Sequence, residues 1–288
     1  MKQLIVTADD FGLSPAVNRA VVRAWQEGIL TGASLLVTGP AAEEAITLAR
    51  EHPGLQVGLH LSLVQGQAVM AHPGFPSLAD VRRNFPDDPV LAGLRYFFLK
   101  PLRRQLAAEI EGQFQAFRAT GLPLSHLDGH LNIHLHPTVF AILRELMPKY
   151  GITSFRLSRE RLRPELAVSR RRIAGKAAEA FIFGTLAEQS RNQLERRGIF
   201  FTREVKGLLN SGQMTEEYLL RALNLLQEGV TEIYFHPAES PCPEISRRMP
   251  GYRHEAELAA LNSLRVRQKL QQLGIGLRNY RGEAKPLP

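Results

Sequence analysis

The sequence predicts an α/β fold, a (β/α) barrel formed by residues 1–288 as a single domain. Short apolar runs alternate with amphipathic helical segments along the chain, which indicates a parallel sheet. The length of 288 residues lies within the size range of one such barrel. Six or seven alternating units favour a closed or nearly closed barrel over a small doubly wound sheet. We therefore expect a TIM-barrel-like fold that is distorted or incomplete.

The first predicted unit is a strand, a polar turn and a helix. Residues 3–7 form an apolar, β-branched run that stops before Asp9 and Asp10. Ser14 is a good helix N-cap, and the apolar stripe that follows ends near Gly28. Two adjacent carboxylates therefore follow directly after a buried strand.

The same alternation predicts the remaining elements. We expect strands at 33–38, 55–63, 125–137, 151–157, 231–235 and 275–280, and helices at about 41–50, 102–120, 137–150, 215–228 and 254–273. Residues 64–89 are rich in Pro, Gly and Asp and predict a long functional loop. The basic segment 160–203 has a weak pattern, and we expect helices there.

A histidine-rich segment, residues 125–137, carries the strongest functional signal. Its polar residues occur at even spacing: His126, Asp128, His130, Asn132, His134 and His136. In an extended segment this period places all six on one face, although Gly129 is expected to bend the chain partway. Imidazoles and a carboxylate this close together are natural metal ligands and proton carriers.

Polar residues at several predicted strand ends point to one site. Asp9 and Asp10, His60, the histidine-rich segment, Arg156 and His236 all lie at or near such ends, where barrels of this kind have their active sites. One of the two aspartates, with His60 and one histidine of the segment, can supply three ligands to a divalent metal and leave a position open. The other aspartate can accept a proton from water, and His236 can donate one.

Composition limits the other functions. The net charge of +8 favours anionic surfaces, but we find no zinc-finger, helix-turn-helix or RNA-recognition signature and expect no nucleic-acid partner. The single cysteine, Cys242, excludes an intramolecular disulfide, and the cytosol is the simplest expected location.

In the apolar run 94–102, Tyr96 to Phe98 lie beside cationic residues and suit peripheral contact with the inner face of the cytoplasmic membrane. A buried helix start is the alternative. The oligomeric state stays open, a homo-oligomer included.

Four motifs carry a resemblance: T-A-D-D-F-G, G-L-H-L, D-G-H-x-x-x-H and F-H-P-A. As a set they resemble the YdjC-like carbohydrate deacetylases, metal-dependent enzymes related to the NodB-type polysaccharide deacetylases. Within that family the chain is most similar to the HpnK-type proteins associated with hopanoid biosynthesis. This further likeness is carried by the stretches T-A-D-D-F-G-L-S-P-A-V-N, R-Y-F-F-L-K-P-L-R-R-Q-L-A-A-E-I, T-G-L-P-L-S-H and H-L-H-P-T.

The resemblance implies a role for each matching residue. It implies Asp9 as general base, Asp10, His60 and His130 as metal ligands, and His236 as general acid. His134 is expected beside the ligands or on the substrate, and His126 and Asp128 as supporting partners. Arg156 is expected either to clamp the catalytic aspartate or to pair with Glu160. Family members often have histidine where this chain has Asn132, which weakens any metal-binding role for that position.

The implied reaction is hydrolysis of an N-acetyl group on an amino sugar, with one divalent ion, Zn²⁺ or Mg²⁺, or else Mn²⁺. The HpnK likeness implies an N-acetylglucosaminyl hopanoid as substrate. A chitobiose-type saccharide is the first alternative. A metal-dependent phosphoesterase is the second, although a two-metal site would usually want more carboxylates.

Overall fold

The computed structural model describes residues 1–72, 77–239 and 243–287, so Cys242 lies outside the described residues. Its strands are β1 (Lys2–Phe11), β2 (Gly32–Leu35), β3 (Gln56–Leu61), β4 (Leu124–Gly129), β5 (Glu204–Lys206), β6 (Gly229–Phe235), β7 (Gly276–Arg278) and β8 (Ala284–Lys285). They form one sheet in the order β4-β3-β2-β1-β6-β5, and all neighbours along this path are parallel. The strand β7 also joins β1, and β8 pairs with β7 in the antiparallel direction. The predicted α/β class is confirmed.

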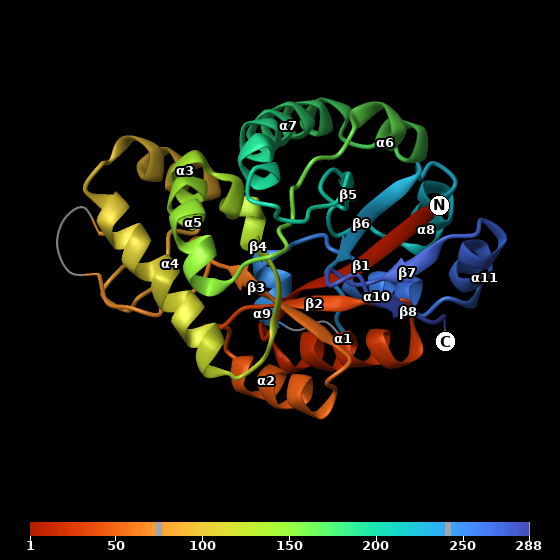
Figure 1. Cartoon of the computed structure of the whole chain (residues 1–288), viewed down its shortest axis with the longest axis horizontal. Coiled ribbons are helices and arrows are strands. Elements are labelled where there is room, and N and C mark those ends of the chain that lie inside the picture. Colours follow the sequence, from red (N-terminus) through yellow and green to blue (C-terminus); the bar gives the residue numbers. More distant parts are fainter. Residues whose placement is uncertain (73–76, 240–242, 288) are drawn as a thin grey trace.

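The two edge strands of this path, β4 and β5, are linked by an irregular segment rather than by a regular strand. Leu127 of β4 pairs with Phe155, and Ser154 pairs with Phe200, as isolated bridges. The predicted strand 151–157 is therefore wrong in extent, because this segment makes only single bridges to its neighbours. The sheet nearly closes on itself through these bridges, as a distorted barrel (Figure 1).

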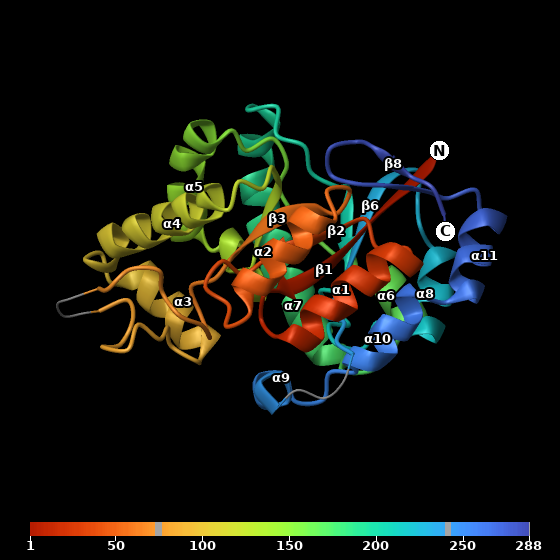
Figure 2. The same ribbon diagram turned by 90° about the horizontal axis from the view of Figure 1, so that it is seen from below.

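Helices surround the sheet (Figures 1 and 2). They are α1 (Pro15–Glu27), α2 (Ala42–Glu51), α3 (Pro89–Phe98), α4 (Leu102–Ala119), α5 (Pro137–Tyr150), α6 (Leu162–Val168), α7 (Ile173–Glu195), α8 (Glu216–Leu223), α9 (Pro243–Arg248), α10 (His254–Leu261) and α11 (Leu264–Gln272), with a 3-10 helix η1 (His130–Leu135). The predicted helix 254–273 is two helices, because Ser263 caps α11 by accepting a hydrogen bond from the backbone of Val266. The helices expected in the basic segment are α6 and α7.

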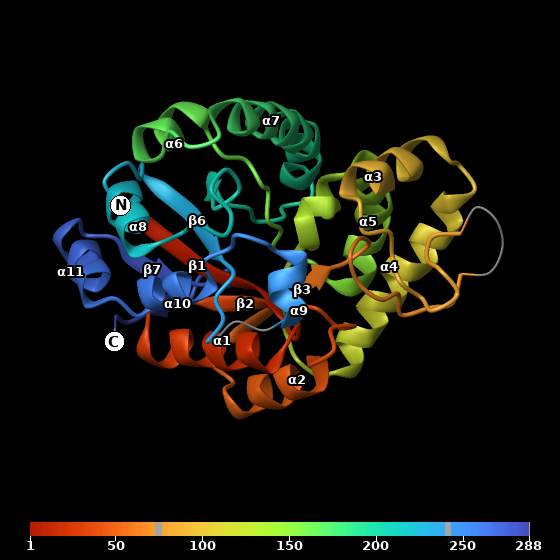
Figure 3. The ribbon, with the colours of Figure 1, turned by 180° about the vertical axis from the view of Figure 1, so that it is seen from behind.

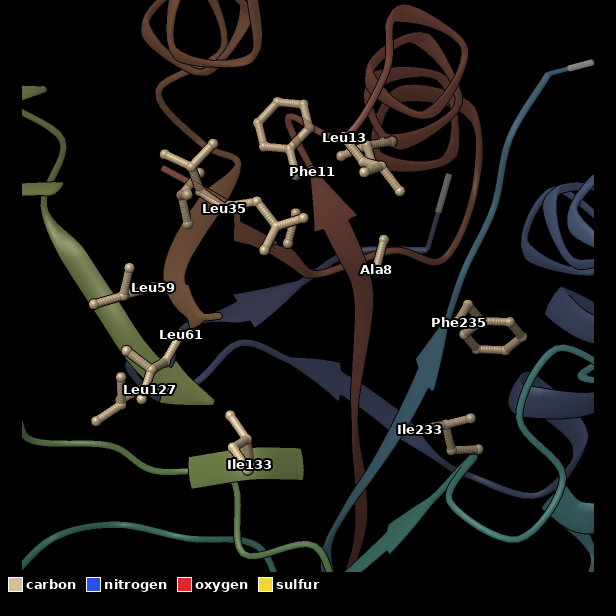
Figure 4. Close-up of a cluster of buried hydrophobic side chains, with 14 of the residues drawn as sticks. Ala8, Phe11, Leu13, Leu35, Leu59, Leu61, Leu127, Ile133, Ile233 and Phe235 are labelled. Carbon is tan, nitrogen blue, oxygen red and sulfur yellow. The ribbon is translucent and has the colours of Figure 1, made fainter. Parts of the chain in front are cut away.

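The apolar core lies between the sheet and the outer helices. Alternate strand residues such as Ala8, Leu59, Leu127 and Phe235 are fully buried in one cluster with apolar residues of the helices (Figure 4). The period of two along each strand then turns the intervening side chains toward the inside of the barrel.

The inside of the barrel is polar. Thr7 of β1 donates a hydrogen bond to Glu232 of β6, and Ser34 of β2 donates one to Asp128 of β4. The space is also tight, since a Cβ atom at Gly58 would lie 2.5 Å from the ring of His126. The candidate site is thus the top of a buried polar network that crosses the barrel.

Candidate active site

The two adjacent aspartates reach the same site because β1 ends irregularly. Asp10 has a φ of 63°, and the register between β1 and β2 shifts between Ala8 and Phe11. A left-handed backbone is unusual for a residue other than glycine, although aspartate tolerates it better than most. In a regular strand successive side chains point to opposite faces, whereas here both carboxylates are buried and both contact residues of the site.

Arg156 holds Asp9 in a two-point clamp. Its guanidinium donates from Nη1 to Oδ2 of Asp9 at 2.7 Å and from Nη2 to Oδ1 at 2.8 Å. Its Nε donates to Glu232 at 3.0 Å, and Nη1 lies 2.9 Å from Oδ2 of Asp128. The guanidinium also lies over the ring of Tyr234, 4.6 Å from its centre. Arg156 therefore contacts Asp9, which is one of the two expectations stated for it. The other expected partner, Glu160, lies 3.8 Å from Lys206 instead.

Asp10, His60 and His130 offer three ligand atoms that lie within 4.8 Å of one another. Oδ1 of Asp10 lies 3.0 Å from Nδ1 of His130 and 3.5 Å from Nε2 of His60. The other oxygen, Oδ2, is buried and has no hydrogen-bond partner in the described part of the chain. A buried carboxylate oxygen without a partner is costly in a bare protein and is a natural ligand for a cation.

The electrostatics of these residues favour positive charge at the same place. Burial opposes ionisation of Asp10, but attraction to His130, His60 and His236 outweighs it and holds the pKa of Asp10 below its usual value. Burial likewise opposes protonation of His60, but Asp128, Asp9 and Asp10 raise its pKa to about 9. The site thus stabilises a positive charge on His60, and a divalent ion would supply such a charge in place of that proton. The residues fit a metal ion.

A second set, Asp9, His60 and Asp128, also has the spacing of metal ligands. Both oxygens of Asp9 accept hydrogen bonds from Arg156, and both oxygens of Asp128 have partners in His60 and Ser34. The free oxygen of Asp10 makes the first set the better candidate.

Asp128 and His126 support the site from below. Oδ1 of Asp128 lies 2.8 Å from Nδ1 of His60, a contact that turns Nε2 of His60 toward Asp10. A carboxylate behind a ligand histidine is the common way to fix its tautomer and orientation. His126 stacks on Tyr280 and lies 3.1 Å from the hydroxyl of Ser34, beside Asp128.

The histidine-rich segment is a strand only as far as Gly129, so the predicted strand 125–137 is too long, whereas the bend expected at Gly129 is confirmed. The chain turns there into η1, in which Leu131 and Asn132 have φ values of 51° and 57°. His130 reaches the ligand set as a result, whereas Nε2 of His134 lies 2.9 Å from the backbone oxygen of Arg156. His134 is fully buried and is not part of the cavity wall, so its geometry agrees with support and not with substrate contact.

His236 follows β6 and faces the cavity. Its Nδ1 is buried without a hydrogen-bond partner among the described residues, and its ring packs edge-on against Tyr234 and Tyr252. Burial lowers its pKa, against the attraction of Asp10 and Asp9. The imidazole is therefore mostly neutral at pH 7, and His236 can act as a general acid only after it takes up a proton during the reaction.

Two further residues of the site have no sequence motif of their own. Glu257 of α10 accepts a hydrogen bond from the backbone of His236 at 2.6 Å, and burial raises its pKa to about 7. Glu232 contacts Arg156 and Tyr280 inside the barrel. Glu232 is a single charged residue in an otherwise uncharged strand, and this was the available signal for it. Glu257 lies in an ordinary helix and gave no signal.

A cavity of about 620 Å³ opens above these residues. Asp9, His60, His130 and His236 line its floor, and Asn132 and Tyr252 lie in its wall. Much of the rest is apolar: Val64, Pro89, Val90, Leu131, Ile133, Ile182, Phe183, Leu186, Leu208, Met249 and Pro250. A pocket of this size encloses a small molecule, and its mostly apolar wall also carries the polar side chains of Gln65, His136, Glu179, Ser211 and Arg248.

These features define an α/β protein with a buried, cation-attracting site at the carboxyl ends of parallel strands. A carboxylate, Asp9, and an imidazole, His236, border the same cavity, which is the arrangement of an enzyme site more than of a binding module. The chain belongs to the YdjC-like protein family, which matches residues 3–272.

Individual relatives agree with this membership. A carbohydrate deacetylase of Thermoanaerobacter pseudethanolicus is 29% identical over 97% of this chain and 98% of that protein. One of Geobacillus stearothermophilus is 37% identical, but the match spans 51% of this chain and only 57% of that protein. A crystal structure from Enterococcus faecalis V583, described as a candidate cellobiose-phosphate cleavage protein, has a TM-score of 0.74 at 26% identity and covers 97% of this chain and 98% of its own.

Proposed function

We propose that this chain hydrolyses the N-acetyl group of an amino sugar with the help of one divalent ion, Zn²⁺ or Mg²⁺, or else Mn²⁺. The main support is that the two adjacent carboxylates have different surroundings. Arg156 binds both oxygens of Asp9, whereas Asp10 lies beside His60 and His130 and keeps one oxygen without a partner among the described residues. Relatives named carbohydrate deacetylases that cover almost the whole chain support the same reaction class.

In this proposal Asp10, His60 and His130 hold the ion, which when bound polarises the acetamide carbonyl and makes a neighbouring water more acidic. Asp9 accepts the proton of the attacking water; each of its oxygens keeps a lone pair beside the Arg156 bond. His236 donates a proton to the nitrogen as the C–N bond breaks, so that acetate and a free amine leave. Glu257 fixes the backbone of His236 and is a positioning residue.

The finer proposal concerns the group attached to the sugar. Most of the cavity wall is apolar, with Val90, Ile182, Phe183 and neighbours, although Gln65, Glu179 and Arg248 also line it, and this wall suits an apolar group attached to the sugar. We propose a lipid-linked substrate, N-acetylglucosaminyl hopanoid, in line with the HpnK likeness of the sequence. A chitobiose-type saccharide is the alternative, and it is compatible with the name carbohydrate deacetylase that the relatives carry.

The test is acetate release by metal-reconstituted protein from N-acetylglucosaminyl hopanoid and from chitobiose. Wild type is compared with Asp9→Asn, His130→Ala and the exposed control Asp80→Asn. Acetate from the lipid substrate, lost in the first two variants and kept in the control, would support the proposal. Equal turnover of chitobiose would remove the lipid assignment. No acetate from either, with phosphate released from sugar phosphates, would favour a phosphoesterase.

A further inference from the structure

The two helices beside the cavity mouth expose an unusual amount of apolar surface. On α3 the exposed side chains are Val90, Leu91, Leu94, Phe97 and Phe98, and on α7 they are Ile173, Phe181 and Ile182. Phe98 is 68% exposed and Phe181 76% exposed. Figure 3 shows α3 and α7 as neighbours along one side of the molecule. We call these eight residues the apolar rim.

The apolar rim meets the cavity at two of its residues. Val90 and Ile182 belong both to the exposed set and to the cavity wall. Phe181 instead lines an open hollow with Arg161 and Arg163 on another face of α7. Tyr96 is buried, and its hydroxyl donates to the backbone of Leu63, so only part of the aromatic run identified in the sequence is available. Single exposed apolar residues are ordinary, but eight on two helices that both reach one cavity indicate an interaction surface.

Basic residues border the apolar rim. Residues 159–172 contain six arginines, and the two glutamates among them, Glu160 and Glu165, are buried. Lys100, Arg103 and Arg104 follow α3. Four acidic side chains nearby pair with basic ones: Glu179 with Arg172, Glu188 with Arg159, Glu145 with Arg103 and Glu204 with Arg161. Asp87 and Asp88 precede α3. The border is therefore basic in sum and complements an anionic surface.

We propose that the apolar rim docks on an anionic lipid bilayer, with the cavity mouth at headgroup level. No helix in the described ranges is long and apolar enough to cross a membrane, so the contact is peripheral. A second copy of the chain is the less suitable occupant, because a protein seated on this rim would cover the cavity mouth. A bilayer instead brings its own lipid-linked sugars to that mouth. The delivery of lipid-linked sugars to the cavity rests on the proposed function, whereas the docking on the bilayer does not.

Vesicle sedimentation tests the docking without any substrate. Vesicles of phosphatidylcholine and phosphatidylglycerol in equal amounts are compared with vesicles of phosphatidylcholine alone, for wild type, Phe97→Ser/Phe98→Ser and Phe181→Ser. The matched control is Leu264→Ser, since Leu264 is 67% exposed on α11, at the far end of the molecule in Figure 1.

We expect wild type and the control to bind the mixed vesicles, and each rim variant to bind roughly tenfold more weakly. Removing the anionic lipid or adding salt should also weaken binding. No binding by wild type, or equal binding by the rim variants, would overturn the proposal. A dimer in solution that Phe181→Ser dissociates would also overturn it, in favour of an interface between copies.

Acetate release from soluble chitobiose separates this proposal from the preceding one. The rim variants keep the whole floor of the cavity, so we expect their turnover of a soluble substrate to match wild type. Vesicle binding without any deacetylase activity would leave the docking surface in place and remove the proposed function.

Discussion

Replacement of Arg156 by lysine is the sharpest test of the buried network. The guanidinium donates four hydrogen bonds, two to Asp9 and one each to Thr7 and Glu232, and contacts Asp128 as well. A lysine ammonium keeps the charge but offers three donors from one nitrogen, so it loses at least one of these bonds and the two-point geometry. One lost bond to a charged group costs about 1.5–3 kcal/mol, and a broken buried ion pair about 3–5 kcal/mol.

We therefore expect Arg156→Lys to lower the free energy of unfolding by about 3 kcal/mol, measured by urea denaturation. The control is Arg159→Lys on the same segment, where the side chain is 42% exposed and lies 3.6 Å from Glu188. That change should stay within about 0.5 kcal/mol of wild type. Because Asp9 also loses its clamp, deacetylase activity should fall about 100-fold. A stability loss no larger than that of Arg159→Lys would refute the reasoning.

Two other predictions follow from contacts of the site. Asp128→Asn should weaken Zn²⁺ binding to metal-free protein about 10- to 100-fold in calorimetry, because the asparagine no longer orients His60. Asp80→Asn, at an exposed position, should leave Zn²⁺ binding unchanged. Burial lowers the pKa of His134 from 6.5 to about 4, so its contribution to stability is present above pH 6.5 and is lost as the pH falls toward 4. His134→Gln keeps a donor for the Arg156 carbonyl but does not titrate. Between pH 7 and pH 4 its free energy of unfolding should therefore fall by about 3 kcal/mol less than that of wild type, measured by urea denaturation at each pH. Equal falls in the two proteins would contradict this.

The strand ends of the site were predictable because their local signals are strong. Apolar runs of the right length stop at Asp9, before His236 and around His60, and parallel strands bring their carboxyl ends to one edge. The positions of these residues in one site follow from that rule alone. Their catalytic and metal-binding roles stay predictions.

Other parts of the site depend on tertiary contacts that no local pattern carries. The turn after Gly129 needs positive φ at Leu131 and Asn132. Asparagine tolerates this conformation but leucine disfavours it, so the even spacing of the segment suggested a longer strand. Ser158 donates to Asn132 and helps to hold that turn. Similarly, the segment around Phe155 has strand composition but only single bridges, because its neighbours are the two ends of the sheet.

The polar interior of the barrel has a consequence for how the chain folds. Thr7 contacts Glu232, and Asp9 contacts Arg156, across 225 and 147 residues of sequence. In the ribosome's N-to-C order of synthesis, β1 lacks one neighbour until β6 emerges, and His126 lacks its stacking partner until Tyr280 emerges. Contacts of such long range slow folding and make it cooperative. The long-range contacts that hold the site together therefore also delay its assembly, and a chain truncated before Tyr280 should stay incompletely folded and prone to aggregate.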